Sequence, residues 1–353
     1  MHLSTSSSKT SSQSINNSSN RSWYLTWLLF ILICFSSLTT YELFLKNKGY
    51  IASIENNKDL WSWYRNKATG GKDKVVIIGA SRSQLDINIP YLKQKMGNHD
   101  IIQLSINGQY PMATLQALAN DESFIGTLIV SLSAQALEPR YFDMQKTHNT
   151  YYANGSSIDK SLNAYLTGLL QSKLRFLHPS LGLEKIANFF DTNHPFQDPP
   201  YTTANLDQSI SADYSKTDSK RLQNHFYSQK KQNYLDATPT TPDIWQENIQ
   251  LVLDYVTAIE KRGGSVVLVR FPTDKGHWLL DEQFYPRQNY WGIITQKSLI
   301  KTVHFNDIKG LSHFDLPDST HLDQSDSIEF TEILFNYLLK KKLIISNRPS
   351  PAK

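Results

Sequence analysis

The residues of this chain whose types and spacing could support nucleophilic chemistry are a serine after the first predicted strand and an acid–histidine pair near the end of the sequence. Ser81 follows residues 75–78 (Val-Val-Ile-Ile), an apolar run that predicts a buried strand and is closed by Gly79. A serine where a strand gives way to a helix lies beside unpaired backbone N–H groups, which can hold a developing oxyanion. The same position suits an ordinary helix N-cap serine, so this stretch alone leaves both interpretations open.

The acid–histidine pair is Asp318-Ser319-Thr320-His321, which precedes the last predicted helix. A carboxylate three residues before a histidine can accept a hydrogen bond from Nδ1–H and leave Nε2 to act as a base. Such a pair often arises by chance and is a weak signal alone. Combined with the serine at the other end of an α/β pattern, it predicts a catalytic triad of Ser81, Asp318 and His321. Ser83 is the alternative nucleophile.

The composition is globular and carries no signal for a cofactor or for nucleic acid. The chain has 353 residues, of which 40% are hydrophobic and 12% aromatic, enough for a substantial core. Its formal net charge is only +4, so nucleic-acid binding is not predicted. Cys34 is the single cysteine and no Cys/His cluster has zinc-site spacing, so no internal disulfide, metal site or cofactor is predicted.

An apolar segment near the N-terminus predicts a membrane anchor. Residues 23–40 carry no charge, and the apolar character continues to residue 45, a length that can span a bilayer. Trp23, Tyr24 and Trp27 would form an aromatic belt at one interface. A cleavable signal peptide and a buried helix are the alternatives. The segment 23–45 is interpreted as an uncleaved transmembrane helix.

The anchor separates two segments that are predicted to lie outside the main domain. Residues 1–22 are rich in Ser and Asn and predict a disordered tail. Residues 46–73 predict a linker that contains a short amphipathic helix around residues 60–64. Basic residues occur on both sides of the anchor, so the positive-inside count leaves its orientation open.

Strands alternate with helices in two blocks, which predicts an α/β fold with a parallel sheet. Strands are expected at residues 75–78, 101–105, 127–132, 266–271 and 303–305. Helices are expected at residues 112–120, 243–262 and 327–340. The domain would comprise residues 74–139 and 241–342, interrupted by an insertion or cap at 140–240 with helical patches near 162–177 and 183–190, and followed by a tail at 343–353.

The chain resembles the SGNH (GDSL-like) hydrolase and acyltransferase superfamily. Gly79-Ala80-Ser81 is similar to its first block, Asn107-Gly108 to its second, and the Asp318 to His321 segment to its last. The resemblance spans residues 75–340 apart from the insertion. Two departures stand out: the acidic residue usual before the nucleophile is Ala80, and the G-x-N-D block is replaced by Ser131-Leu132-Ser133-Ala134. The resemblance implies a three-layer α/β/α domain.

The resemblance also implies roles for individual residues. Ser81 would be the nucleophile, His321 the base and Asp318 the residue that orients the imidazole. The oxyanion hole would use the backbone N–H groups of Ser81 and Gly108. Ser133, Gln135 or Asn107 could substitute for the asparagine of the missing block. Candidate substrate contacts are Arg82, Gln135, Arg287 and Trp291. The favoured interpretation of Arg82 is nevertheless a solvated helix residue, and aromatic residues at this density more often belong to the core.

Membrane-anchored members with a similar serine block O-acylate cell-envelope polysaccharides, often beside a multi-spanning membrane-bound O-acyltransferase. The leading hypothesis is therefore serine-dependent O-acyl, typically acetyl, transfer to an exported or envelope polysaccharide through an acyl-Ser81 intermediate. The resemblance would place the catalytic domain on the extracytoplasmic side of the inner membrane. The alternatives are an envelope carbohydrate esterase with the same triad and an inactive binding or assembly protein that retains the fold.

Overall fold

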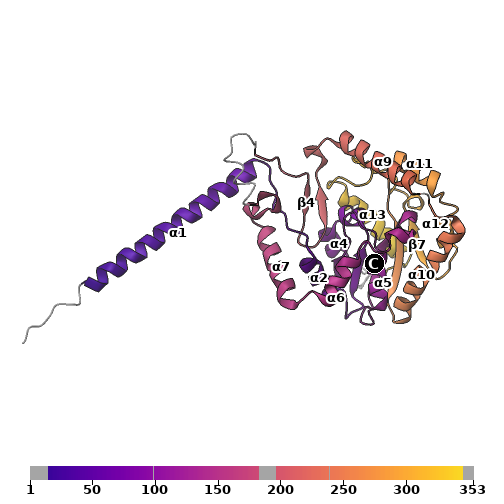
Figure 1. Cartoon of the computed structure of the whole chain (residues 1–353), viewed down its shortest axis with the longest axis horizontal. Coiled ribbons are helices and arrows are strands. Elements are labelled where there is room, and N and C mark those ends of the chain that lie inside the picture. The colour runs from indigo at the N-terminus through magenta and orange to yellow at the C-terminus, as the bar shows by residue number, and fades with distance from the viewer. Residues whose placement is uncertain (1–14, 98, 183–195, 238, 345–353) are drawn as a thin grey trace, which may run out of the picture.

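The computed structural model describes residues 15–97, 99–182, 196–237 and 239–344 of the chain (Figure 1). The strands are β1 (Lys74–Ile78), β2 (Asp100–Gln103), β3 (Thr127–Ser131), β4 (Thr202–Ala204), β5 (Ile210–Ala212), β6 (Ser265–Arg270) and β7 (Lys301–His304). The helices of the first half are α1 (Ile15–Asn47), α2 (Lys58–Lys67), α3 (Ser81–Leu85), α4 (Ile89–Met96), α5 (Met112–Asn120), α6 (Lys146–Asn154) and α7 (Ile158–Gln171). Those of the second half are α9 (Ser219–Asp236), α10 (Pro242–Lys261), α11 (Lys275–Phe284), α12 (Trp291–Thr295) and α13 (Ser327–Lys340).

The centre of the molecule is a parallel sheet. Within the described residues its five strands lie in the order β2-β1-β3-β6-β7, and every neighbouring pair is parallel. β1 lies between β2 and β3, so the connections that leave β1 and β2 run in opposite directions across the sheet. In an open α/β sheet this reversal leaves a crevice at the carboxyl ends of the strands, where ligands bind. The end of β1, and with it Ser81, is at that crevice.

Successive residues of the strands pack into two separate hydrophobic cores. In β1, Val76 and Ile78 face one core and Val75 and Ile77 the other, and all four are at most 1% exposed. Residues of α2, α5 and α10 fill the first core, and residues of α4 and α13 fill the second. This alternation is the physical basis of three layers, because each face of the sheet must be covered. The predicted three-layer α/β/α fold with a parallel sheet is confirmed.

The segment predicted as a linker, residues 46–73, is part of the domain. Its helix α2 packs on the sheet, with Leu60 and Trp61 at 1% and 2% exposure in the first core. Trp61 Nε1 also donates a hydrogen bond of 3.1 Å to the carbonyl oxygen of Leu104, just after β2. The predicted amphipathic helix is present, but its apolar face covers the sheet. The linker prediction is wrong for this reason.

Two tail predictions also need correction. Helix α1 begins at Ile15, so residues 15–22 are helical, and residues 1–14 lie outside the described part of the chain. The extension is physically simple, because no proline or glycine interrupts residues 15–22. At the other end, Ile344 is 3% exposed and packs in the second core, although residues 343–353 were predicted as a tail. Residues 345–353 lie outside the described residues.

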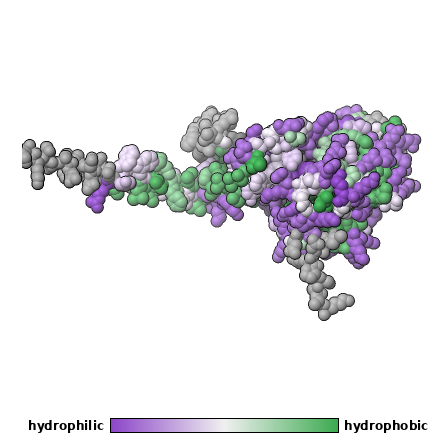
Figure 2. All heavy atoms as spheres, turned by 90° about the horizontal axis from the view of Figure 1, so that it is seen from below, coloured by the Kyte–Doolittle hydropathy of each residue, from purple (hydrophilic) through white to green (hydrophobic). Residues whose placement is uncertain are grey.

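Helix α1 leaves the domain as a single rod with an apolar surface. Residues 21–47 are long and apolar enough to span a membrane, and only 6% of the most apolar stretch is buried by the rest of the protein. Figure 2 shows hydrophobic residues along this rod, while the domain surface is mostly hydrophilic. A core helix of a soluble domain would be mostly buried, so the interpretation of this segment as a buried helix does not hold.

The carboxyl end of α1 is fixed to the domain. Both carboxylate oxygens of Glu42 accept hydrogen bonds, from the backbone N–H groups of Arg175 and Phe176 and from Arg175 Nη1 at 2.9 Å. Arg175 Nε donates to the carbonyl oxygen of Tyr50 at 2.8 Å. Leu45, Tyr50 and Leu181 are buried together in a small apolar cluster beside this ion pair.

Residues 140–240 contain α6, α7, the antiparallel pair β4–β5 and α9. The helical patch predicted near residues 162–177 is α7, which ends earlier, at Gln171. The patch predicted at 183–190 lies outside the described residues. In Figure 1, α6 and α7 lie beside α2, while α9 crosses the upper side of the domain near α11.

Candidate active site

Ser81 is the first residue of the short helix α3, immediately after the turn that ends β1. Ala80 is in an extended conformation, so the chain turns sharply between the strand and the helix. Gly79 makes this turn possible, because a Cβ at that position would collide with Ser83 Oγ and with Ser131 Cβ of the neighbouring strand β3. Ser81 is half-buried and lines a cavity, whereas Ser83 is fully buried and hydrogen-bonded to Ser105.

Ser81, His321 and Asp318 form one hydrogen-bonded chain. His321 Nε2 is 2.7 Å from Ser81 Oγ, and His321 Nδ1 is 2.8 Å from Asp318 Oδ2. The residues come from opposite ends of the sequence, 240 positions apart for the serine and histidine. With Nδ1–H donating to the carboxylate, Nε2 is the acceptor that faces the serine hydroxyl, which is the connectivity of a Ser–His–Asp triad.

Asp318 is held by donors on both carboxylate oxygens. Oδ1 accepts from the N–H groups of Thr320 and His321, and Oδ2 accepts from the Tyr214 hydroxyl at 2.6 Å. Asp318 is 1% exposed. Burial alone would raise its pKa, but the hydrogen bond and charge of His321, with the bonds from Tyr214 and Thr320, lower the pKa below its ordinary value. Asp318 is therefore an anion that orients the imidazole.

The turn that carries this acid and base has a strained residue at its centre. Ser319 has φ of +77°, in the left-handed region that favours glycine. Its carbonyl oxygen accepts hydrogen bonds from the N–H of Asp274 and from the hydroxyl of Thr273. These two contacts come from the loop after β6 and fix the turn against the carboxyl end of the sheet, where Ser81 also lies.

A second buried carboxyl group, Asp86, lies behind the histidine. It caps the carboxyl end of α3, is fully buried, and its Oδ1 accepts from the N–H of Leu322 at 3.0 Å. Burial raises its pKa to about 7, although the charge of nearby His321 acts in the opposite direction. Asp86 therefore links the helix that begins with Ser81 to the backbone immediately after His321.

The predicted oxyanion donors lie together at the cavity. Among the described residues, the backbone N–H groups of Ser81 and Gly108 have no hydrogen-bond acceptor. Gly108 has φ of +72° and, with Asn107, lies exposed at the rim of the cavity that Ser81 lines. Ser133 also lines this cavity, as does Tyr110. The structure thus brings these four predicted donors to one site, and Asn107 is the exposed side-chain amide among them.

The cavity has a volume of about 450 Å³, in the usual range of small-ligand sites. Part of its wall comes from residues 140–240: Tyr201, Thr202 and Ile210 belong to the β4–β5 region, while Phe226, Gln229, Lys230 and Asn233 form one face of α9. The Phe226 ring lies edge-on to His321, with centroids 6.2 Å apart. The segment predicted as an insertion or cap therefore supplies one side of the site.

Of the four predicted substrate contacts, two lie at this cavity. Arg82 and Gln135 line it; Arg82 Nε donates to the carbonyl oxygen of Thr320 at 3.3 Å, and Gln135 is hydrogen-bonded to Tyr110 and Tyr141. Arg82 is thus a half-buried residue of the site, and its interpretation as a solvated helix residue does not hold.

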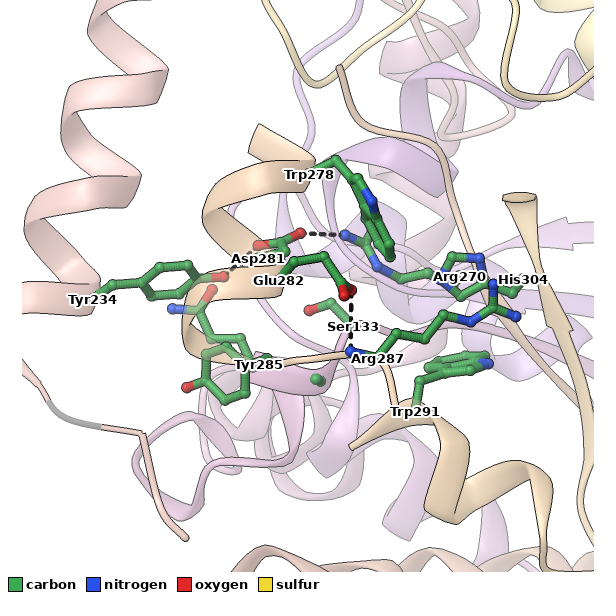
Figure 3. Close-up of a pocket in the computed structure, with 12 residues that line it drawn as sticks. Ser133, Tyr234, Arg270, Trp278, Asp281, Glu282, Tyr285, Arg287, Trp291 and His304 are labelled. Atoms are coloured by element: carbon green, nitrogen blue, oxygen red, sulfur yellow. Dashed lines mark hydrogen bonds and ion pairs between the residues drawn. The ribbon is translucent and has the colours of Figure 1, made fainter. Parts of the chain in front are cut away.

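Arg287 and Trp291 do not line the Ser81 cavity. They line a small neighbouring space of about 20 Å³, which has room for about one water molecule. Figure 3 shows the side chains around this space. Trp291 is 3% exposed and belongs to the hydrophobic core, and Arg287 forms an ion pair with Asp307. The structure therefore does not bring these two predicted substrate contacts to Ser81: Trp291 packs inward in the core, and Arg287 is paired with Asp307.

Two residues of the site carried no signal in the sequence. Tyr214, the donor to Asp318, lies 104 positions before it in unpatterned polar sequence. Gln145 is fully buried, and its side-chain NH₂ donates to the carbonyl oxygens of Gly79 and Gln109, each at 2.9 Å. Gln145 thereby ties the turn before Ser81 to the loop that contains Gly108. The described residues contain no group of three or more acidic, His or Cys side chains that could hold a metal ion.

The fold and these side chains define a three-layer α/β protein with a Ser–His–Asp set at the carboxyl edge of its sheet. No protein-family model and no curated protein matches the chain. Among solved structures, the chain is similar to one described as "Crystal Structure of TesA", with 11% sequence identity and a TM-score of 0.34. The match covers 77% of this chain and 99% of that one.

Proposed function

We propose that the protein is a serine-dependent acyl-transfer enzyme of the SGNH type that forms an ester on Ser81. The observation that carries this proposal is the chain of hydrogen bonds from Ser81 Oγ through His321 to Asp318, at 2.7 and 2.8 Å. A hydroxyl is a weak nucleophile unless an adjacent base takes its proton, and this geometry supplies that base. The position of the serine at the crevice of the sheet gives a substrate access to it.

The first half-reaction follows from the geometry. Ser81 Oγ attacks the carbonyl carbon of an ester while its proton passes to His321 Nε2. The negative charge that develops on the carbonyl oxygen is held by the N–H groups of Ser81 and Gly108 and by the amide of Asn107. The intermediate then collapses: the bond to the leaving alcohol breaks, His321 returns the proton to that alcohol, and the acyl group remains on Ser81.

In the second half-reaction a hydroxyl of a glycan is the acceptor. It gives its proton to His321 Nε2 and attacks the acyl carbon to form a new ester. The bond from the acyl carbon to Ser81 Oγ breaks, and His321 returns the proton to Ser81 Oγ. The acceptor is a cell-envelope or exported polysaccharide, and the protein is held by α1 in the inner membrane with its domain on the extracytoplasmic side. The acyl group, typically acetyl, comes from a membrane-bound O-acyltransferase partner. These parts of the proposal rest on the resemblance together with the length of α1.

A carbohydrate esterase is the second candidate function. Its supporting observation is that Ser81 is only half-buried in an open-rimmed cavity, so that water can reach an acyl-Ser81 intermediate. A non-catalytic binding protein is less well supported, because such a protein has no need of a hydrogen-bonded triad. Replacement of the usual G-x-N-D block by residues 131–134 favours the binding protein, whereas in the proposed enzyme the side-chain amide of Asn107 takes the place of the missing asparagine.

The test is covalent labelling of the full chain in detergent with a serine-directed fluorophosphonate, followed by mass spectrometry. We expect one adduct, on Ser81, that is absent in His321→Ala. Ser83→Ala, two residues further along the same helix, is the matched control and should keep the label. Absence of an adduct on Ser81 would contradict the proposal.

Transfer and hydrolysis are distinguished by their products. With an activated acetyl ester as donor, a transferase gives an acetylated glycan when glycan is added, whereas an esterase gives acetate at the same rate with or without it. In cells, Ser81→Ala should abolish acylation of the polymer at an unchanged level of the protein. Polymer acylation that persists in this variant would exclude the transfer reaction.

A further inference from the structure

The cavity beside Ser81 is positively charged. Arg82, Lys230 and Arg270 line it, and no aspartate or glutamate does so among the described residues. Arg82 lies next to the nucleophile in sequence, Lys230 comes from α9, and Arg270 ends strand β6. Three elements that are distant in sequence therefore direct cationic residues to the same space.

One carboxylate lies behind two of these cations. Asp281 accepts from Lys230 Nζ at 2.5 Å and from Arg270 Nη2 at 2.6 Å, and it also accepts from the Tyr234 hydroxyl at 2.6 Å. Figure 3 shows Arg270 and Tyr234 converging on Asp281. A single negative charge cannot balance both cations, so this group retains one surplus positive charge.

Arg82 adds a second positive charge. Its Nε donates to a neutral backbone carbonyl, and no ion pair joins it to a carboxylate in the described part of the chain. Against Asp281 these three cations leave a surplus of two positive charges, and the Asp318 carboxylate behind His321 reduces that surplus to one. The charge of Arg82 also acts on the carboxyl group of Asp86, whose pKa of about 7 makes it a partial counter-charge at most.

A surplus of buried charge is costly without a counter-ion. The side chains of Lys230 and Arg270 are only 16% and 5% exposed. Burial lowers the pKa of Lys230 to about 8 and lowers the pKa of Arg270, against the opposing effect of Asp281. Charges that are removed from water are stable when an opposite charge approaches them, because the interaction strengthens as the dielectric constant falls. An anionic ligand would supply that charge.

Aromatic side chains occupy other parts of the same wall. Tyr110, Tyr141, Tyr201 and Phe226 line the cavity with the cations. Such rings offer flat apolar faces against which the C–H face of a sugar can pack, and arginine can bind a carboxylate or a phosphate through two parallel hydrogen bonds. The combination suits a charged sugar chain better than a simple ester.

We propose that this cavity binds an anionic group of the acceptor glycan, a carboxylate or a phosphate, through Arg82, Lys230 and Arg270. This proposal rests on the proposed function and specifies its substrate: an acidic glycan, whose charged group lies beside the hydroxyl that receives the acyl group from Ser81.

Titration calorimetry on the full chain in a nonionic detergent tests this proposal. The probes are an oligouronate, the same oligosaccharide with its carboxyl groups reduced to alcohols, and a glycerol-phosphate oligomer. We expect at least one anionic probe to bind ten-fold or more tightly than the reduced oligosaccharide, with an affinity that falls as salt increases. The two anionic probes distinguish a carboxylate from a phosphate.

Matched variants locate the binding group. Lys230→Gln and Arg82→Gln should each weaken binding of the preferred anionic probe about ten-fold. Lys231→Gln, the same change at the next, exposed residue of α9, should leave the affinity within two-fold. Equal affinity for charged and reduced oligosaccharides, or no binding of any probe, would overturn the proposal.

Fluorophosphonate labelling of the same preparation separates the two proposals. Labelling of Ser81 without a preference for anionic probes would support the serine enzyme and contradict the proposal that its acceptor is acidic. A preference for anionic probes without labelling of Ser81 would contradict the proposed enzymatic function and support a site that only binds anions.

Discussion

At the scale of single residues, the site depends on how Asp318 is held. The Tyr214 hydroxyl donates to the carboxylate oxygen that also faces His321. Removing it with Tyr214→Phe loses a hydrogen bond to a charged group, a contribution of about 1.5–3 kcal/mol. We expect the rate of fluorophosphonate labelling of Ser81 to fall roughly ten-fold. The control is Tyr255→Phe on α10, and equal labelling rates in Tyr214→Phe and the unaltered chain would contradict this role.

Asp86 gives the stability of the protein a pH dependence. Burial raises its pKa from 3.8 to about 7, so the folded state binds more protons than the unfolded state between these values. Its contribution to the free energy of unfolding is therefore complete below about pH 4 and is lost as the pH rises through 7.

Asp86→Asn should remove this loss, because an amide cannot ionise and still accepts from the N–H of Leu322. Between pH 4 and 7, we expect the free energy of unfolding of the unaltered chain to fall relative to the variant by about 1 kcal/mol per pH unit. Urea unfolding at several pH values measures this difference in the free energy of unfolding. Asp254→Asn, on the surface of α10, is the control. Parallel pH curves for Asp86→Asn and the unaltered chain would refute the assignment.

The site residues that could be predicted are those that belong to a recognisable local sequence motif. Ser81, Asp318 and His321 belong to short local motifs, and each motif predicts a turn and a hydrogen bond that the structure contains. Tyr214 and Gln145 lie in irregular sequence, and their contacts form only when residues 140–240 close over the sheet. Ser319 could not be identified as strained, because nothing local demands a positive φ from it.

At the scale of elements, helix α2 is a structural part of the domain. Trp61 is 2% exposed in the first core and donates to the carbonyl oxygen of Leu104. Trp61→Ala would leave a large void and an unpaired carbonyl, so we expect the free energy of unfolding to fall by about 3–5 kcal/mol. Trp27→Ala, in the exposed part of α1, should leave unfolding of the domain unchanged. Urea denaturation followed by circular dichroism measures both, and a loss below about 1 kcal/mol for Trp61→Ala would contradict a core position.

The spacing of apolar residues predicts where a helix lies in the sequence more reliably than it predicts the surface on which that helix packs. The last helix was predicted at residues 327–340, which are the observed bounds of α13, because its apolar residues recur at helical spacing. The segment around Leu60 shows the same amphipathic spacing over fewer residues, and spacing alone does not say which surface such a helix covers. The sequence therefore predicted a linker for this short helix next to the anchor, although the helix packs on the sheet.

At the scale of the whole molecule, α1 is the element that bears on a membrane location. Its exposed surface is apolar over a length that can cross a bilayer. We expect the full chain to remain in the membrane fraction after a carbonate wash at high pH, and the domain to be digested when protease is added to spheroplasts. Release into the supernatant would exclude an anchor, and a protected domain would place it on the cytoplasmic side.

If the protein has the proposed function, the ion pair between Glu42 and Arg175 limits how far from the membrane the protein can act. A catalytic domain on a flexible tether explores a wide volume above the bilayer, whereas this domain is joined to α1 by buried contacts on both sides of Gly49. If α1 spans a bilayer, every copy holds Ser81 at one height and one tilt. Under the proposed function, polysaccharide would then be acylated only in a thin layer parallel to the membrane, as each chain passes through that layer.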